Sequence, residues 1–404
     1  MTTQWLKFAW LNTLRNRRRS AVTVGIAALG TAAILLAGGF ALFTYQGLAQ
    51  ISARTTGHLI VARPEQFQRD EDTPLQNGLD DVDAVKAALL ADPDVRQVLP
   101  RVEFSGLISN GDKSTVMMAA GIDPDAEFAV KGPFLRVQAG SVLTSDQRGQ
   151  VMLGEGLARS LKAAPGTSLT LLASTTEGSL NALDVIVQGV FSTGIPDIDK
   201  RLVYTDVVTA QKLLVTPRVS SLGVFLRDME ATAPARARIA AASPHLAVQT
   251  WLDQATFYKS VKELYNRIFG ALGLIIGVIV VFVVTNAMAM AIIERTREIG
   301  TLRALGTLPA QLTRTFALEG MVLGGAGALV GALVALAVSV LLLIFPVEMP
   351  PPPGRSNGYP LQIVIDGTLY AGTLVAMVAL SMLASALVAR RTVGKPIVDA
   401  LAHV

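Results

Sequence analysis

Cysteine is absent from the 404 residues, and histidine occurs only three times. Without a thiol, the chain has no disulfide, no thiolate nucleophile, no cysteine-based zinc site and no lipoprotein acylation site. His58, His245 and His403 do not have a spacing typical of metal ligands. The sequence therefore predicts no metal site and no bound cofactor in this chain.

Two catalytic motifs are also missing. No segment fits GxxxxGK[ST], the loop that cradles nucleotide phosphates, and no segment fits GxSxG, the nucleophile elbow. The acidic clusters at 71–72 and 80–83 are explained more simply by an acidic approach to a helix N-terminus than by paired catalytic carboxylates. We expect no catalytic residue here, so the chain is not expected to be an enzyme.

Charge is scarce, because 16% of the residues are charged and 51% are hydrophobic. This balance is too apolar for an ordinary soluble protein. Four uncharged runs each exceed the roughly 20 residues that a helix needs to cross about 30 Å of hydrocarbon. They predict transmembrane helices at 20–48, 266–293, 315–345 and 367–389. The first run far outlasts the apolar part of a signal peptide, so it is read as a retained anchor.

Basic residues gather at three places along the chain. They precede the first span within 1–19, lie between the second and third spans within 294–314, and follow the fourth span within 390–404. The positive-inside rule puts these segments and both termini in the cytoplasm. The loop 346–366 and the large region 49–265 then lie outside. Residues 50–265 hold 21 basic and 25 acidic residues, so the positive excess of the chain lies on the inner face and nucleic-acid binding is not implied.

The large region 49–265 alternates short strand and helix patterns. Apolar positions at helical spacing from Val82 to Leu89 predict a helix, and Asn110-Gly111 predicts a hairpin. Strand–helix–strand patterns follow in two further blocks, the first beginning near Arg136. We expect an α-helical membrane domain of four transmembrane helices with an inserted α+β periplasmic domain of two subdomains, one interrupting the other.

The segment after the second span is unusual, because charged and apolar residues alternate around its whole circumference. Gly300 and Gly306 weaken it as a helix at two points. Neither lipid nor water suits such a surface, whereas a groove with apolar sockets and charged rims on another cytoplasmic protein does. The alternative is that its arginines only anchor the topology. The predicted docking residues are Glu294, Arg295, Arg297, Glu298, Ile299, Gly300, Leu302, Arg303, Leu305 and Gly306.

Small residues repeat at four-residue or near four-residue spacing in two spans. Such stripes let helix backbones approach closely, and direct contact with a cargo is the alternative. The glycines are Gly273 and Gly277 in the second span and Gly320, Gly324, Gly327 and Gly331 in the third. Glu319, at the cytoplasmic start of the third span, is expected to pair with an arginine such as Arg314 or Arg297.

Segments flanking the spans carry weaker signals. Residues 1–19 mix aromatic and basic side chains, which suits a helix lying along the inner membrane surface. The outer loop contains "MPPPPGRSNGYP", a stiff polyproline stretch followed by a turn. That stretch either caps two helices or contacts a partner.

Five stretches, in this order, resemble the MacB/FtsX-like permeases of ABC transporters, the family of the macrolide exporter, the lipoprotein-release permeases and FtsX. "WLNTLRNRRRSAVTVGIAALG" resembles the entry into the first span of that family. "GSVLTSDQRGQVMLGEGLARSL" with "VQGVFSTGIPDIDKRLVY" resembles its periplasmic core. "ERTREIGTLRALG", "LEGMVLGGAGALVG" and "ARRTVGKPIVDAL" resemble its coupling segment, third span and tail.

The resemblance implies a bacterial inner-membrane permease without a fused ATPase. It implies two cytoplasmic ABC ATPase subunits that bind ATP and Mg²⁺, a second permease copy or homologue, and contact with membrane lipids. Partners on the outer side would be a periplasmic adaptor or a cargo protein. Glu294 to Gly306 maps onto the coupling helix of the family.

The expected function is therefore an ATP-driven permease subunit that exports or extracts a hydrophobic or amphiphilic cargo, such as a lipoprotein, lipid, drug or peptide. An alternative is a non-transporting, FtsX-like mechanotransmitter that regulates a periplasmic cell-wall enzyme. A third is a membrane-anchored binding protein with no ATPase, which leaves the charged segment after the second span unexplained. The sequence leaves the cargo open.

Overall fold

The computed structural model describes residues 17–68, 73–131, 136–350 and 358–393. The predictions for the interfacial segment before Arg17, for most of the polyproline stretch and for the tail beyond Val393 lie outside these residues. The chain divides into two compact units. A helical unit contains residues 1–46, 261–348 and 360–404, and an α+β unit contains residues 47–260 and 349–359.

Within the described residues, four helices are long and apolar enough to cross a membrane, as the sequence predicts. They are α2 (Arg17–Thr56), α10 (Thr256–Glu294), α12 (Pro309–Ile344) and α13 (Gly367–Val393). At 40 and 39 residues, α2 and α10 run for about 60 Å, roughly twice the hydrocarbon thickness. The α10 helix is unbroken from Thr256, so it begins ten residues before the predicted span 266–293.

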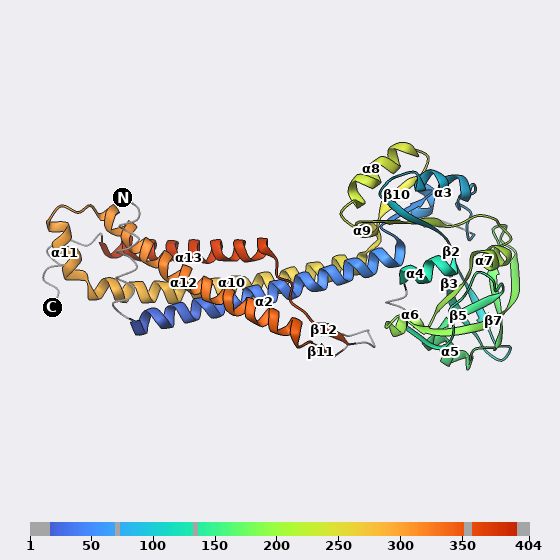
Figure 1. Ribbon diagram of the computed structural model, residues 1–404, viewed down its shortest axis with the longest axis horizontal. Helices are drawn as coiled ribbons and strands as arrows, with labels where there is room; N and C mark the ends of the chain where they lie inside the picture. Colours follow the sequence, from blue (N-terminus) through green and yellow to red (C-terminus); the bar gives the residue numbers. More distant parts are fainter. Residues whose placement is uncertain (1–16, 69–72, 132–135, 351–357, 394–404) are drawn as a thin grey trace. The chain divides into compact units, whose positions relative to one another are not determined.

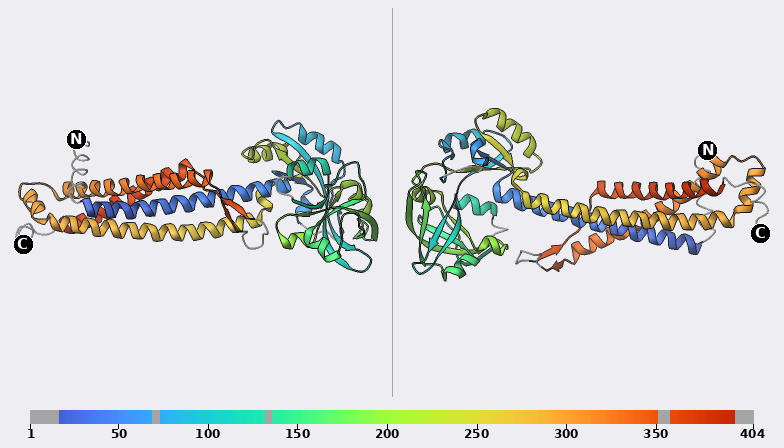
Figure 2. Two further views of the ribbon diagram at one scale, coloured as in Figure 1. Left: turned by 60° about the horizontal axis from the view of Figure 1, so that its bottom comes forward. Right: turned by 180° about the vertical axis from the view of Figure 1, so that it is seen from behind.

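Helix α12 packs closely against two neighbours through its small residues, and the four helices run side by side (Figure 2). Gly320 and Gly324 lie against Ser385 and Ser381 of α13. One turn further on, Gly327 and Gly331 lie against the backbone of α2. A methyl group at Gly331 would stand 2.3 Å from the carbonyl oxygen of Ala28, closer than any real contact. Backbone proximity therefore fixes the α2–α12 crossing.

Replacing Gly331 by Ala is expected to destabilise the helical unit by about 1–3 kcal/mol, the usual cost of overpacking. The matched control is Gly325→Ala on the same helix, where the new methyl group would meet Val378 at an ordinary 3.7 Å. Thermal unfolding of both variants in detergent checks this. Equal midpoints for the two variants would contradict the assigned crossing.

The α+β unit is built on strands that form one continuous hydrogen-bonded path in the order β10-β1-β9-β2-β3-β8-β5-β7-β4. Strand β6 pairs with both β2 and β7, so β2, β3, β8, β5, β7 and β6 close into a ring. Figure 1 labels β2, β3, β5 and β7 of this ring. The strands are β1 (Leu59–Ala62), β2 (Val95–Ser109), β3 (Ser114–Ile122), β4 (Arg136–Gly140), β5 (Gln150–Gly154), β6 (Ser168–Ser174), β7 (Leu180–Ser192), β8 (Leu202–Asp206), β9 (Ser221–Leu226) and β10 (Ala247–Thr250).

Strand β2 belongs to both halves of the unit. Its first part, Val95 to Arg101, pairs with β9, and its second part, from Val102, pairs with β3. The closed ring lies in sequence between β2 and β9, so it interrupts the smaller β10-β1-β9-β2 sheet. This agrees with the expected pair of α+β subdomains. Alternate residues such as Ile108, Met117 and Leu171 are buried in the core.

The predicted helix and the predicted hairpin of the α+β unit are both present. The predicted helix at 82–89 is α3, and the Asn110-Gly111 turn joins β2 to β3, with Gly111 at a φ of +93°. The other elements are η1 (Pro64–Gln68), α3 (Val82–Leu90), α4 (Pro124–Lys131), α5 (Glu155–Leu161), α6 (Pro196–Asp199), α7 (Val207–Leu214), α8 (Thr232–Ala242), α9 (Trp251–Gln254), α11 (Thr296–Ala304), β11 (Val347–Met349) and β12 (Tyr359–Leu361).

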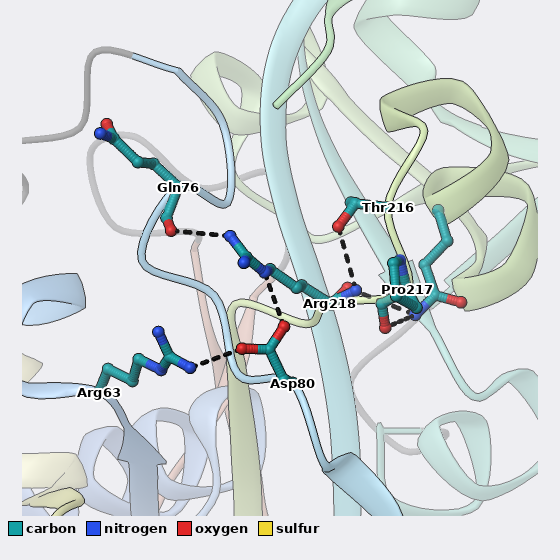
Figure 3. Close-up of polar contacts among 7 residues, drawn as sticks. Arg63, Gln76, Asp80, Thr216, Pro217 and Arg218 are labelled. Atoms are coloured by element: carbon teal, nitrogen blue, oxygen red, sulfur yellow. Dashed lines mark hydrogen bonds and ion pairs between the residues drawn. The ribbon is translucent and has the colours of Figure 1, made fainter. Parts of the chain in front are cut away.

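Asp80, within the acidic cluster at 80–83, joins two arginines from distant segments (Figure 3). Asp80 accepts hydrogen bonds from Arg63 at 2.6 Å and from Arg218 at 2.7 Å. Arg218 also donates to the carbonyl oxygen of Gln76 at 3.0 Å. The hydrogen bond from Arg218 is the main reason that the pKa of Asp80 is below its usual value. Asp80 is thus paired with two cations and serves the fold.

A buried ion pair anchors α4 and the end of α2 to strand β2. Arg101 donates to Glu127 at 2.9 Å, and both side chains are buried. The same guanidinium donates through its Nη1 atom to the carbonyl oxygen of Thr55. One side chain therefore connects three elements that are distant in sequence. Removing one partner of a buried pair leaves an uncompensated charge, which is strongly unfavourable.

Replacing Arg101 by Met is expected to lower the free energy of unfolding of the α+β unit by about 3–5 kcal/mol, because Glu127 is then buried without its cation. The control is Arg159→Met, which removes the exposed pair Arg159–Glu155 and should change little. Denaturant unfolding of the full-length variants measures both values. The assignment fails if the two variants unfold at the same denaturant concentration.

Candidate functional site: the segment between α10 and α12

The predicted docking segment forms a short helix set off by a break at each end. Helix α10 ends at Glu294, Arg295 leaves helical geometry, and α11 covers Thr296–Ala304. After α11, Gly306 has a φ of +97°. The amides of Gly306 and Thr307 donate to the carbonyl oxygens of Arg303 and Leu302, the Schellman pattern that ends a helix. Helix α12 then begins at Pro309, a favoured first helical residue.

Two ion pairs connect this segment to the neighbouring helices. Glu294 accepts from Arg19 of α2 at 3.1 Å. Arg295 donates to Glu319 of α12 at 3.2 Å, and the Glu319 side chain is 6% exposed. The sequence correctly predicts that Glu319 pairs with an arginine, and the structure pairs it with Arg295, which the sequence did not suggest. The break in the helix at Arg295 turns its side chain toward α12, which helical spacing alone does not reveal.

The apolar residues of α11 and of the turn that follows it divide into buried and exposed groups. Ile299 and Gly300 are buried within the helical unit. In contrast, Leu302 is 43% exposed, Leu305 is 80% exposed and Leu308 is 60% exposed. Leu308 was not singled out from the sequence, because it follows Gly306 and lies outside the helical pattern. Three leucines in seven residues thus form an exposed apolar surface, called the leucine surface below.

Charged side chains border the leucine surface. Arg297 and Glu298 on α11 are exposed, and Arg303 is half-buried. Apolar side chains beside charges of both signs are the composition of a protein-binding surface with a hydrophobic centre and polar rim. The predicted docking residues therefore separate into anchoring residues (Glu294, Arg295, Ile299, Gly300) and surface residues (Arg297, Glu298, Leu302, Arg303, Leu305), with Gly306 ending the helix.

The six glycines of the predicted stripes lie in two different environments. Those of α12 lie at the contacts with α13 and α2 described above. In α10, Gly273 and Gly277 instead line a cavity of about 670 Å³ between α2, α10 and α13. Tyr45 and Asn266 lie at this cavity and share a 2.8 Å hydrogen bond. The rest of its lining is mainly apolar, including Leu42, Phe269 and Met377.

The described part of the chain shows no group of three histidine, aspartate or glutamate side chains that could hold a metal ion. Its buried acids are accounted for by structural partners. Asp199 accepts from Ser192 and Thr193, and Asp206 accepts from Arg148 and Thr209. In the helical unit, the ion pairs Arg19–Glu294 and Arg295–Glu319 lie beside α11.

Two family models match the chain. The model "FtsX-like permease C-terminal" matches residues 270–397, which include α11, α12 and α13. The model "MacB-like periplasmic core domain" matches residues 20–242, more than half of the chain.

Two curated relatives are about one quarter identical to this chain over more than 250 residues. The lipoprotein-releasing system transmembrane protein LolE of Haemophilus influenzae is 25% identical over 267 residues, 64% of each chain. The corresponding LolC of Xylella fastidiosa (strain Temecula1) is 27% identical over 256 residues, 61% of each chain. The chain thus spans somewhat less than two thirds of the length of these relatives.

Among solved structures, the periplasmic region of MacB from Actinobacillus actinomycetemcomitans covers 50% of this chain and 92% of its own, at 17% identity and a TM-score of 0.37. The family models carry the assignment, because one of them spans more than half of the sequence and the other covers the docking segment. The chain belongs to the MacB/FtsX-like family of ABC transporter permeases.

Proposed function

We propose that this chain is the transmembrane subunit of an ATP-driven complex in a bacterial inner membrane. Both termini and α11 lie in the cytoplasm, and residues 49–265 lie in the periplasm. The observation that carries the proposal is the leucine surface on a short helix that is ion-paired to two membrane helices. An exposed apolar surface of this kind needs a protein partner. That partner is a separate ABC ATPase, present as two subunits, which holds ATP and Mg²⁺.

Movement of the ATPase would reach the permease through the leucine surface, and the two ion pairs would pass it on to α2 and α12. When ATP brings two ATPase subunits together, α11 moves with the subunit that it contacts. The Arg295–Glu319 pair passes that displacement to α12, and Arg19–Glu294 passes it to α2. The unbroken α10 is the direct continuation of the segment. Movement of the periplasmic domain is the output.

The cargo we propose is hydrophobic or amphiphilic, with a lipid-modified protein as the favoured class. The relatives LolC and LolE are named as parts of a lipoprotein-releasing system. The mainly apolar cavity between α2, α10 and α13 suits an acyl chain better than a hydrophilic solute. A second permease copy or homologue would complete the complex.

The double change Leu302→Ala and Leu305→Ala is expected to weaken ATPase binding at least about tenfold, because it removes two central apolar contacts of the interface. The measurement is copurification of the ATPase with the permease, together with ATP turnover by the complex. The matched control is Leu329→Ala with Leu333→Ala, two exposed leucines within the α12 span. Normal copurification with the α11 variant would refute docking through this surface.

Replacing Glu319 by Gln is expected to separate ATP turnover from output, because it removes the anion that ties Arg295 to α12. The ATPase should still copurify, while cargo release in proteoliposomes falls several-fold. The reversed pair, Arg295→Glu with Glu319→Arg, should recover part of the release if the ion pair itself transmits the movement.

Two results of the Glu319→Gln experiment would count against the proposal. Unchanged release would remove the ion pair from the coupling route. ATP-driven movement of the periplasmic domain, with no cargo released even by the unmodified complex, would favour the mechanotransmitter function over transport.

A further inference from the structure

A second cavity, of about 490 Å³, lies within the α+β unit, apart from the docking segment. The C-terminal turns of α2, the start of β2, the end of α4 and the end of β9 enclose it. Its lining is Gln50, Ala53, Arg54, His58, Arg96, Gln97, Ala129, Val130, Phe225, Leu226, Arg227 and Met229. Neither the expected function nor the family models assign a role to it.

The cavity lining is strongly cationic. Arg54, Arg96 and Arg227 all line it, and no acidic residue does. In the described part of the chain, the side chains of Arg96 and Arg227 take part in no ion pair or side-chain hydrogen bond, although six other arginines of this unit are ion-paired. Asp228 lies near His58 but is not in the lining. Arg96 and Arg227 thus bring two unpaired positive charges to the cavity, and such charges attract an anion.

The walls of the cavity are held in place before any ligand binds. The buried Arg101 joins Thr55, one residue after Arg54, to Glu127 of α4, two residues before Ala129. On the opposite side, Nδ1 of His58 accepts from the amide of Leu226 at 3.1 Å. In the neutral imidazole the proton is then on Nε2, which makes that atom a hydrogen-bond donor. The site is therefore pre-organised and rich in donors.

The remaining lining is apolar, with Val130, Phe225 and Met229 among its members. A cavity with arginines and an apolar wall suits an anion carried on an apolar body better than a small hydrated ion. Its position along α2 points the same way. Arg54 is the first charged residue after the uncharged run of α2, and it follows Leu48, the predicted end of the first span, by six residues, or roughly 9 Å of helix. Headgroups occupy about 5–7 Å beyond the hydrocarbon, so these bounds put Arg54 near their outer edge.

We propose that this cavity binds the phosphate group of a lipid headgroup from the outer leaflet, with Arg54, Arg96 and Arg227 around the phosphate and the glycerol backbone against Val130, Phe225 and Met229. Arginine suits this role because its planar guanidinium can donate two hydrogen bonds to one phosphate. The bound lipid would link the foot of the periplasmic domain to the membrane. The proposal is independent of ATP coupling, since it involves no residue of the docking segment.

The test is a binding titration with the purified full-length protein in an uncharged detergent. The probes are dihexanoylphosphatidylglycerol, sn-glycerol 3-phosphate and inorganic phosphate. The double variant Arg96→Gln with Arg227→Gln should weaken binding of the short-chain lipid at least about tenfold, because two charge-assisted hydrogen bonds are lost. Each single change should weaken it about threefold.

The matched control is Arg201→Gln with Lys212→Gln, which removes two exposed positive charges from the same unit outside the cavity. It should bind the lipid within about twofold of the unmodified protein. A second variant, Ala129→Trp, keeps every charge and places a large side chain at the exposed edge of the cavity. It should reduce lipid binding more than phosphate binding.

The outcomes separate the sources of the phosphate. Tighter binding of the lipid than of both soluble phosphates, lost in the cavity variants alone, supports the headgroup site. Equal binding of inorganic phosphate with the same loss in the double variant supports the anion site and overturns the lipid assignment. If the double variant binds all three probes like its control, the proposal is wrong altogether.

Discussion

A lipid bilayer offers no water to hydrogen-bond with backbone amides, and this constraint sets the form of the helical unit. Inside hydrocarbon every N–H and C=O group must find a partner within its own segment, so each span is an unbroken helix. The chain can change direction only where water or polar side chains accept the exposed backbone groups. Such places occur at Arg295, where α10 ends, and at Gly306, where a Schellman pattern ends α11. The candidate site therefore lies where the backbone can leave helical geometry, because its N–H and C=O groups find other partners there.

The same constraint explains why the helices associate through small residues. Lipid tails are as apolar as leucine, so burying leucine between helices gains little. Close backbone approach gains dispersion contacts instead, as at Gly331 against Ala28. Outside the hydrocarbon the balance reverses, because water makes exposed apolar area unfavourable. An exposed leucine is thus expected on the lipid face of α12, whereas an exposed Leu305 after α11 supports the proposed protein partner.

Much of this architecture was predictable because its signals are local. Uncharged runs predicted the spans and Asn110-Gly111 predicted a hairpin, and the structure has both. The alternation of leucine and charge after α10 predicts a docking segment, and this stays a prediction. The pairing of Glu319 was predicted correctly, but its partner was not, because the turn of Arg295 toward α12 depends on a break in helix geometry. Closure of the strand ring was not predictable either, since β6 reaches β2 through tertiary pairing.

The cationic cavity was beyond sequence analysis for the same reason. Arg54, Arg96 and Arg227 are distributed over more than 170 residues, and each one alone resembles a solvated surface arginine. Folding of β1, β2 and β9 as neighbours brings them to one hollow. Long-range sheet pairing thus brings together residues that no sequence motif connects, whereas the residues predicted to dock a partner are contiguous in the sequence.

The proposed transmission of movement requires a rigid element and a joint that can rearrange. Helix α10 is the candidate for the rigid element, and the ion pair between Arg295 and Glu319 is the candidate for the joint. A helix resists bending because its hydrogen bonds act cooperatively, so α10 can carry a displacement over its 39 residues. Ion pairs at the edge of the membrane are directional yet can be broken and remade, which suits a joint better than a packed core does. The joint at Arg295 and Glu319 therefore lies between a rigid rod and a small helix that an external protein can hold. In the proposed route, movement of α11 would act on α2 and α12 through these ion pairs, while the glycine contacts hold α12 against α2 and α13.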